Sequence, residues 1–349
     1  MQDIVNCRTE ALGGHVYFCD PCDDYRESFH SCKNRHCPKC GHEQAQEWLT
    51  AQKCRLLPVT YFLVTFTLHD NLRRLARSNQ KLIYDLLFRT SAAALQKLAH
   101  DPEYVGGRLG MIGVLQTWTR DLGVLHPHIH YLIPGGGLSE DGTQWLATRH
   151  NYLMPKRALS KIFRAKFRDA LKKTQLFNSV PPETWKQRWV VHIEAVGTGE
   201  HALKYLAPYI FQVAISNKRL VKLEDGMVTF RYQQAKTKQW KSKTVPVEAF
   251  ISSFLEHVLP HRFVKVRYYG LLSSQQREQF EKAKEHLGAT NANSESETIA
   301  EQQGESPAES KEEKPKTLCC PQCGSEMRWI KELPRKTIPP TAGRRTRAP

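Results

Sequence analysis

Hydrophobic positions along the middle of the chain follow two different periods. Residues 59–68, with the sequence VTYFLVTFTL, are rich in β-branched and aromatic side chains and predict a buried strand. Residues 71–100 carry leucines at helical spacing with no internal Pro or Gly, and predict a helix. The same criteria predict strands at 111–118, 126–133 and 189–196, helices at 152–175, from about 200 and at 250–258, and a hairpin or meander over 218–232 and 239–248. This mixture predicts an α+β fold, a central antiparallel sheet with helices packed against it.

The pattern changes at both ends of the chain. Residues 1–50 are dense in Cys and His and poor in aliphatic side chains, so we expect a small module that needs a metal to fold. The main domain is expected at 55–283. Residues 284–316 are mostly Ser, Glu, Ala, Asn and Gln, which predicts a disordered acidic linker. A short Cys-containing basic tail, 317–349, follows.

The charge of the chain points to a polyanionic partner. Lys and Arg number 51 against 35 Asp and Glu, a formal net charge of +16. Residues 285–314 hold eight Glu and two Lys, so this segment is −6 and the remainder is +22. A strongly basic folded body favours nucleic acid as the partner. Neither an export signal nor an apolar run long enough to cross a membrane is visible, so we expect a cytoplasmic protein without a membrane partner.

Ten cysteines in a reducing compartment indicate metal binding rather than disulfides. Two CxxC pairs stand 14 residues apart, Cys19 with Cys22 and Cys37 with Cys40, and four thiolates in this spacing predict one closed, structural Zn²⁺ site. A second set that could bind zinc consists of Cys7, His15, Cys32 and His36. Near the C-terminus, Cys320 and Cys323 form a single knuckle that needs ligands from elsewhere.

The segment His126-Pro-His128-Ile-His130 carries the strongest chemical signal. Side chains at i, i+2 and i+4 of a strand point to the same face, and successive members of this row stand about 6.6 Å apart along the strand. Two imidazoles can therefore converge on one ion. A metal ion bound by only two or three protein side chains keeps open coordination positions, to which a substrate oxygen can bind. The same motif occurs in barrel hydrolases, but there it opens a series of βα units that this chain lacks.

Tyr205 and Tyr209 are expected in the helix that follows the Gly197-Thr198-Gly199 turn. A spacing of four residues puts both rings on one helix face. Tyrosine, with a pKa near 10, is a poor nucleophile at neutral pH unless a cation polarises the group that it attacks. A metal site and two tyrosine hydroxyls in one domain therefore complement each other. Pro208 between them predicts a kink.

From Cys7 to about Leu272 the chain resembles the two-tyrosine HUH rolling-circle transposases of the insertion-sequence ninety-one family. The resemblance rests on RTEALGGHV, SCKNRHCPKC, VTFTL, HPHIHYLIPGGGL, KYLAPYI and HVLPHRFVKVRYYGLLS. It implies an HUH catalytic domain at 55–283, in which His128 and His130 hold the metal and Tyr205 and Tyr209 are nucleophiles. His126 and Gln116 are both open as the third ligand, because this ligand varies among HUH enzymes.

The resemblance also implies a reaction. With Mg²⁺ or Mn²⁺, a tyrosine cleaves single-stranded DNA at the ends of an insertion sequence and keeps a 5′-phosphotyrosine link until another strand's 3′-OH rejoins it. Such a protein is expected in the bacterial cytoplasm, associated with the nucleoid. The alternatives are a plasmid replication initiator or relaxase of the same class, and a zinc-dependent nucleic-acid-binding protein without catalysis.

Overall fold

The structure of the chain is a computed structural model that describes residues 2–34, 36–118, 125–211, 215, 219–234, 237, 239–256, 258–288 and 318–336. The chain forms two compact units. Unit 1 combines residues 1–43 with residues 307–349, and unit 2 consists of residues 44–306. The C-terminal segment therefore belongs to the same unit as the N-terminal module. Most of the predicted acidic linker, residues 289–316, lies outside the described residues, and its first residues, 284–286, form the last turn of helix α8.

Unit 2 is built on a five-stranded sheet with the strand order β12-β4-β5-β3-β8. Its strands are β3 (Tyr61–Thr67), β4 (Gly110–Trp118), β5 (Leu125–Pro134), β8 (Val191–Ala195) and β12 (Val266–Gly270). Every neighbouring pair in this sheet is antiparallel. A small pair, β6 (Gly136–Leu138) and β7 (Trp145–Ala147), follows β5. The predicted α+β fold with a central antiparallel sheet is confirmed.

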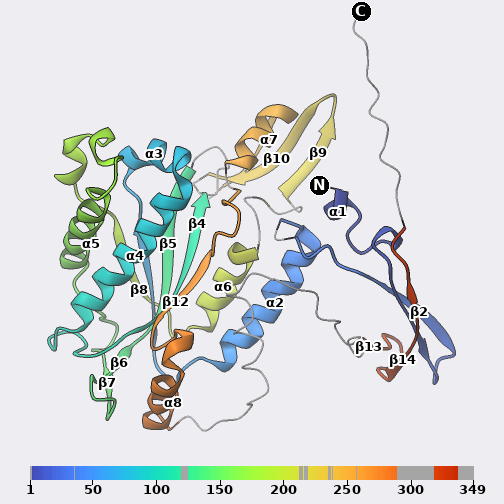
Figure 1. Cartoon of the computed structure of the whole chain (residues 1–349), viewed down its shortest axis with the longest axis horizontal. Helices are drawn as coiled ribbons and strands as arrows, with labels where there is room; N and C mark the ends of the chain where they lie inside the picture. Colours follow the sequence, from blue (N-terminus) through green and yellow to red (C-terminus); the bar gives the residue numbers. More distant parts are fainter. Residues whose placement is uncertain are drawn as a thin grey trace, which may run out of the picture. The chain divides into compact units, whose positions relative to one another are not determined.

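Helices cover both faces of this sheet (Figure 1). One face packs against α3 (Arg73–Ser78), α4 (Gln80–Ala99) and α5 (Lys156–Leu171). The other packs against α6 (Glu200–Phe211), α8 (Arg277–His286) and the part of α2 (Pro38–Cys54) that belongs to unit 2. Because strand residues alternate between faces, Ile129 and Tyr131 of β5 belong to the first cluster and Leu132 belongs to the second.

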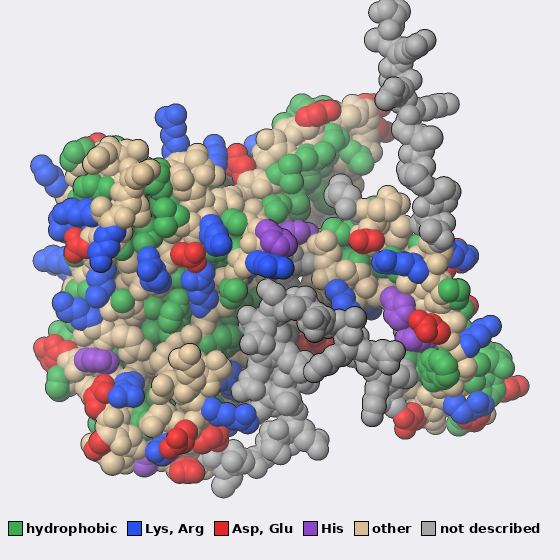
Figure 2. Space-filling model, viewed as in Figure 1, with side chains coloured by type: hydrophobic (Ala, Val, Ile, Leu, Met, Phe, Trp, Pro, Cys, Tyr) green, Lys and Arg blue, Asp and Glu red, His purple; other side chains and the backbone are tan. Residues whose placement is uncertain are grey.

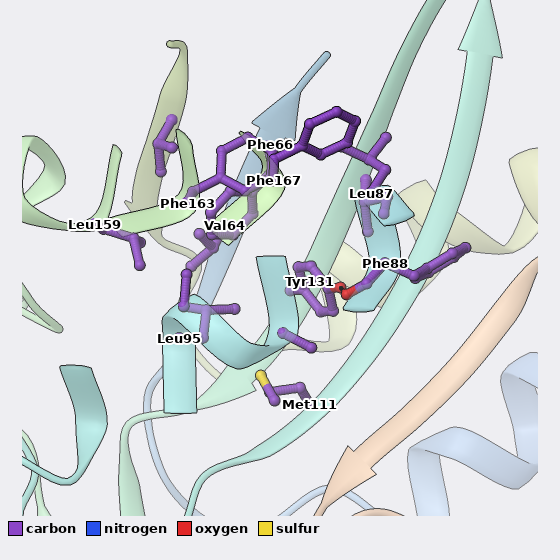
Figure 3. Packing of buried hydrophobic residues seen from close by; sticks show 14 of the residues in the cluster. Val64, Phe66, Leu87, Phe88, Leu95, Met111, Tyr131, Leu159, Phe163 and Phe167 are labelled. Carbon is purple, nitrogen blue, oxygen red and sulfur yellow. Dashed lines mark hydrogen bonds between the residues drawn. The ribbon is translucent and has the colours of Figure 1, made fainter. Parts of the chain in front are cut away.

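The first face carries the larger core, which Figure 3 shows from close by. Phe66 of β3 packs edge to face against Tyr131 of β5 and Phe163 of α5, with ring centroids 5.8 Å and 4.9 Å away. The buried Tyr131 hydroxyl lies 2.8 Å from the Ser91 hydroxyl of α4 and donates to the Phe88 carbonyl. This paired polar group ties α4 to the middle of β5, next to the histidines.

The predicted helix over 71–100 is in fact two helices. A 3₁₀ turn over Asp70–Leu72 leads into α3, and α4 starts only at Gln80. Asn79 between them has φ −134° and ψ 47°, outside the helical region. The helical spacing of the leucines did not reveal this break, because no Pro or Gly marks it in the sequence. The helix predicted at 152–175 is shorter, since α5 covers Lys156–Leu171.

A separate three-stranded sheet lies between α6 and β12 in sequence. Its antiparallel strands are β9 (Leu220–Glu224), β10 (Met227–Gln233) and β11 (Trp240–Pro246), and α7 (Val247–Leu255) follows. The predicted meander is confirmed, with an added turn at Asp225-Gly226, where both residues have positive φ. One face of this sheet buries Val228 and Phe230 against α7.

Unit 1 is a four-stranded antiparallel sheet with the order β13-β14-β1-β2. Helix α1 (Gln2–Val5) precedes β1 (Gly14–Cys19) and β2 (Asp24–Phe29), and the C-terminal segment contributes β13 (Leu318–Cys319) and β14 (Glu326–Leu333). Strand β14 pairs with β1 from Gly14, opposite Leu333, to Phe18, opposite Arg328.

No helix in the described part of the chain is long and apolar enough to cross a membrane.

The core beneath the histidine strand depends on α4. Leu87 is completely buried in that helix, whereas Leu82 of the same helix is 37% exposed. Leu87→Ala should lower the free energy of unfolding of unit 2 by about 2–5 kcal/mol, because it removes buried methyl groups and leaves a cavity. Leu82→Ala is the matched control and should change it by about 0.5 kcal/mol or less. Chemical denaturation of both variants checks this, and equal effects would show that α4 does not pack as described.

Candidate functional site

The three histidines lie on one face of β5, opposite the large core. His130 stands opposite Val114 of β4 and Thr65 of β3, and His128 stands opposite Gln116 and Thr67. Facing residues of neighbouring strands share a sheet face, so Thr65 and Gln116 flank the histidine row on its two sides. Ile129 and Tyr131, between the histidines, point into the core beneath. The alternation predicted for this strand thus creates a polar row on a rigid sheet.

Both ring nitrogens of His128 have a close polar neighbour. Its Nδ1 lies 2.6 Å from the backbone carbonyl oxygen of His126, so Nδ1 carries the proton and donates it. In the neutral ring this leaves a lone pair on Nε2. The side-chain oxygen Oε1 of Gln116, another acceptor, lies 3.1 Å from that Nε2. Two acceptors that face each other at this distance are well suited to share a cation.

His130 presents the same arrangement one step along the strand. Its Nδ1 lies 2.9 Å from the Thr65 hydroxyl. Its Nε2 is buried and has no hydrogen-bond partner among the described residues, and the same is true of Nε2 of Gln116. The rings of His128 and His130 are 4.9 Å apart and nearly perpendicular. A buried ring nitrogen without a partner is costly unless something binds there.

His126 has a different environment. Its Nδ1 accepts a hydrogen bond from the guanidinium of Arg73, 2.7 Å away, and Arg73 also pairs with Asp70 at 2.5 Å. A neutral imidazole whose Nδ1 accepts carries its proton on Nε2, so neither nitrogen offers a lone pair to an ion. Accordingly, within the described residues His126, His128 and His130 do not form a group of three converging ligand atoms.

Burial keeps the three imidazoles neutral. It lowers the pKa of His128 to about 4, and it lowers the pKa of His130 to about 3, with the neighbouring His128 adding to the effect. Burial, followed by the charge of Arg73, also lowers the pKa of His126. Neutral imidazole is the form that binds a metal ion, so at neutral pH no proton has to leave His128 or His130 first.

The helix that carries the tyrosines covers the histidine face. Gly199, with φ +83°, makes the turn from β8 into α6, and a Cβ there would meet the ring of Tyr61 at 2.9 Å. Buried residues of α6 pack on β4 and β5, and Tyr205 projects from the helix with 41% of its surface exposed. The ring of Tyr205 stands edge to face with that of His130, with centroids 5.9 Å apart. A tyrosine and the histidine pair therefore share one site.

The second tyrosine is described only by its backbone. Tyr209 lies in α6, which continues through Pro208 to Phe211, and the side chains of Pro208 and Tyr209 lie outside the described part of the structure. Two residues of the site escaped sequence analysis. Thr65 and Arg73 are common residue types in unremarkable contexts, and only the strand register and the fold bring them to the histidines.

Unit 2 also presents a basic surface. Figure 2 shows Lys and Arg side chains spread over the part of its visible face that α4 and α5 form. Helix α5, KRALSKIFRAKFRDAL, has six basic residues and one acidic residue, and its apolar positions face the core. The basic side chains are therefore directed to solvent, where they can contact phosphates. This distribution is consistent with the polyanionic partner expected from the sequence.

The cysteines of unit 1 form two groups, and the grouping differs from the prediction. Cys37 and Cys40 lie with Cys7 and Cys32, whereas Cys19 and Cys22 lie with the C-terminal Cys320 and Cys323. The single site predicted from Cys19, Cys22, Cys37 and Cys40 is thus wrong. The two CxxC pairs are separated by the β1–β2 hairpin, whose six-residue strands span about 20 Å, so they cannot share one ion.

The first group is a closed set of thiols. Cys7 and Cys32 lie 3.5 Å and 3.8 Å from Cys40 between sulfur atoms, and burial raises the pKa of Cys7 to about 12. A cation is what allows such crowded thiols to ionise together. The alternative second set is not supported either, because neither His15 nor His36 belongs to a described cluster. The His15 ring instead packs on that of His30, with centroids 4.7 Å apart.

Comparison with known proteins places these features in a family. Residues 110–279 match a family model described as "Putative transposase", and residues 1–68 match one described as "Transposase zinc-binding domain". "Putative transposase y4qJ" of Sinorhizobium fredii is 41% identical over 299 residues, 80% of this chain and 75% of that protein. "Transposase for insertion sequence element IS801" of Pseudomonas savastanoi pv. phaseolicola is 28% identical over 292 residues, 78% of this chain and 69% of that protein.

This chain belongs to the insertion-sequence ninety-one family of transposases. Transposases cut DNA and transfer its strands, so the partner of this transposase is DNA, including the ends of an insertion sequence. The N-terminal module is a transposase zinc-binding domain, which agrees with the predicted structural Zn²⁺. A search of the solved structures gives no match. The matched segment 110–279 contains the histidine strand and the tyrosine helix.

Proposed function

We propose that this transposase cleaves and rejoins single-stranded DNA through a 5′-phosphotyrosine intermediate, in the manner of a rolling-circle HUH enzyme. The observation that carries the proposal is the arrangement around β5. His128 and His130 each use Nδ1 for a hydrogen bond and keep Nε2 for a ligand, next to the Tyr205 ring. The two rings, a neighbouring acceptor and a tyrosine are the parts that such a reaction needs.

The donor set fits a divalent cation with three protein ligands. Nε2 of His128, Nε2 of His130 and Oε1 of Gln116 would hold it, which makes Gln116 the third ligand in place of His126. The hydrogen bond from Nδ1 of His128 to the His126 carbonyl fixes the tautomer of that ring, and the contact between Nδ1 of His130 and the Thr65 hydroxyl orients the second ring. A mixed nitrogen and oxygen set without thiolates suits Mn²⁺ or Mg²⁺ in a site that keeps positions open for phosphate.

The cation would supply Lewis-acid polarisation of the scissile phosphate. The hydroxyl oxygen of Tyr205 or Tyr209 attacks the phosphorus, the P–O3′ bond breaks, and the phenolic proton is lost while the departing 3′ oxygen gains one. The DNA is left as a 5′-phosphotyrosine and a free 3′-OH. Attack by the 3′-OH of another strand reverses the step and releases the tyrosine. The ester conserves the bond energy, so the reaction needs no nucleotide cofactor.

His126 and Arg73 have a supporting role in this proposal. One nitrogen of the Arg73 guanidinium, Nη2, contacts both the Asp70 carboxylate and Nδ1 of His126. It lies at the start of the histidine row, where the remaining donors of a guanidinium suit a DNA phosphate. His126 is then a positioning residue for a phosphate-binding arginine.

The histidine pair should be needed for cleavage and not for binding. A metal contributes several kcal/mol to phosphoryl chemistry, and each 1.36 kcal/mol is a factor of ten in rate. We therefore expect His128→Ala or His130→Ala to slow Mn²⁺-dependent cleavage of single-stranded element ends about a thousandfold or more. DNA affinity should change little, because Lys and Arg contacts with phosphate supply most of it. Gel assays of cleavage and binding measure both.

The matched control is His100→Ala, because His100 is the C-cap of α4, the helix that packs on the opposite face of the sheet. It should retain cleavage. Full cleavage by the His128→Ala, His130→Ala double variant would exclude the metal site.

The third ligand can be identified from metal affinity. Gln116→Ala should weaken Mn²⁺ binding by about 10–100-fold or more, because it removes a direct ligand, an effect at least as large as losing a group that orients one. His126→Ala should weaken Mn²⁺ binding much less and instead reduce affinity for DNA, through the loss of Arg73 positioning. Calorimetric titration of each variant with Mn²⁺ compares them. The opposite ranking would make His126 the ligand and Gln116 a bystander.

The tyrosines should be nucleophiles. Tyr205→Phe with Tyr209→Phe keeps both rings and removes both hydroxyls, so we expect a folded, DNA-binding protein that forms no denaturant-resistant adduct with labelled single-stranded DNA. Tyr152→Phe is a control with a similarly exposed side chain, 39% against 41% for Tyr205. The single variants show which tyrosine starts the reaction. Peptide mapping of the adduct to any other residue contradicts the assignment, and the absence of an adduct in the wild type favours a non-catalytic DNA-binding role.

A further inference from the structure

The second cysteine group joins the two ends of the chain. We propose that Cys19, Cys22, Cys320 and Cys323 bind a zinc ion of their own, which fastens the C-terminal β13–β14 hairpin to the N-terminal module. The transposase would then carry two structural zinc ions, one in each thiol cluster. The family model of the zinc-binding domain ends at residue 68, so half of the ligands of this second site lie outside the segment that the model describes.

The sulfur positions fit a tetrahedral ion. All four Sγ atoms lie within 4.8 Å of one another, with 3.5 Å between Cys19 and Cys323 and 3.9 Å between Cys22 and Cys320. Zinc–sulfur bonds of about 2.3 Å in a tetrahedron require sulfur atoms about 3.8 Å apart. A disulfide requires about 2.05 Å, so these contacts are not disulfide bonds. Four converging sulfurs leave no position for water, which makes the site structural.

The backbone presents the four thiols as two equivalent knuckles. Cys19 ends β1 and Cys22 lies in the turn to β2, while Cys320 and Cys323 lie in the turn between β13 and β14. The second turn is fixed by hydrogen bonds from the Cys320 amide to the Ser325 carbonyl, 2.8 Å, and from the Gly324 amide to the Cys320 carbonyl, 2.9 Å. Gly324 has φ +76°, a conformation that glycine adopts without strain.

The apolar surface buried between the C-terminal hairpin and the N-terminal strands is too small to hold the hairpin by itself. Among the described residues, the buried cluster at this end of unit 1 has Tyr17 and Met327 as its large side chains, besides Cys19 and Cys320, and Leu318 packs against it. The ion pairs that link the two chain ends among the described residues are exposed, and such pairs contribute little: Arg328 with Asp20 at 3.2 Å, Arg335 with Asp3 at 3.8 Å and Lys336 with Glu10 at 2.6 Å. A sheet with so little core needs a metal or a covalent link.

The sequence separation adds a further demand. Cys22 and Cys320 are 298 residues apart, and bringing such distant segments together costs chain entropy. The pairing of β14 with β1 over Gly14–Phe18 depends on that closure. An ion with four thiolate ligands, two from each end, offsets this cost at the point where the two hairpins meet. The C-terminal CxxC pair, which has no second pair nearby in the sequence, is completed to four ligands by Cys19 and Cys22.

The number of bound zinc ions tests the proposal on the full-length protein. Elemental analysis by mass spectrometry should give two zinc ions per chain for the wild type and one for the Cys320→Ser, Cys323→Ser variant. Cys319→Ser is the matched control, because Cys319 is an exposed neighbour outside both clusters, and it should keep two. One zinc in the wild type, or two in the double variant, would overturn the proposal.

A second measurement does not depend on the variant's folding. Wild-type protein loaded with ¹¹³Cd should give two cadmium resonances in the region of tetrathiolate sites, and one resonance would overturn the second site.

Amide hydrogen exchange tests whether the ion holds the C-terminal hairpin to the N-terminal module. In the double variant, exchange in β14 and along the β14-facing edge of β1 should speed up at least tenfold, while β5 in unit 2 keeps its protection. Unchanged protection of β14 without the second zinc would show that the ion does not hold the hairpin.

Discussion

The candidate active site depends on the antiparallel register of three strands. Because β5 pairs with β4 and β3 in a fixed register, His128 faces Gln116, and His130 faces Thr65. A slip by one residue would turn every histidine into the core and bring Ile129 and Tyr131 to the polar face. The core prevents that slip, since Phe66, Tyr131 and Phe163 interlock beneath the same residues. Packing on one face of the sheet thus sets the chemistry on the other.

Burial has two opposing consequences in this site. It lowers the pKa of His128 to about 4 and of His130 to about 3, which keeps the rings neutral and able to bind a metal ion. It also leaves Nε2 of His130 without a hydrogen-bond partner among the described residues, which is costly in a folded protein. The cation proposed for this site would remove that cost.

Unit 1 follows a different rule, because its sheet has almost no apolar core. Its cohesion comes from thiol clusters at the two ends of the β1–β2 hairpin. Cys7, Cys32, Cys37 and Cys40 lie at the open end, and the second group lies at the turn. With the zinc ions proposed for these clusters, the hairpin would be held at both ends although little of it is buried.

The sequence by itself determined the features that depend on local pattern. Period and residue type located β3, β4, β5 and α6, and i, i+2 spacing placed His128 and His130 on one face of β5. The break at Asn79 was missed because it rests on one backbone conformation that many residues can adopt.

Only the tertiary structure decided which cysteines meet. CxxC spacing brings two thiols together locally, but the partner of each pair is chosen by the hairpin length and by the return of a strand nearly 300 residues later. The same holds for Thr65 and Arg73, whose contacts with His130 and His126 follow from strand pairing and helix placement, and no local signal records them.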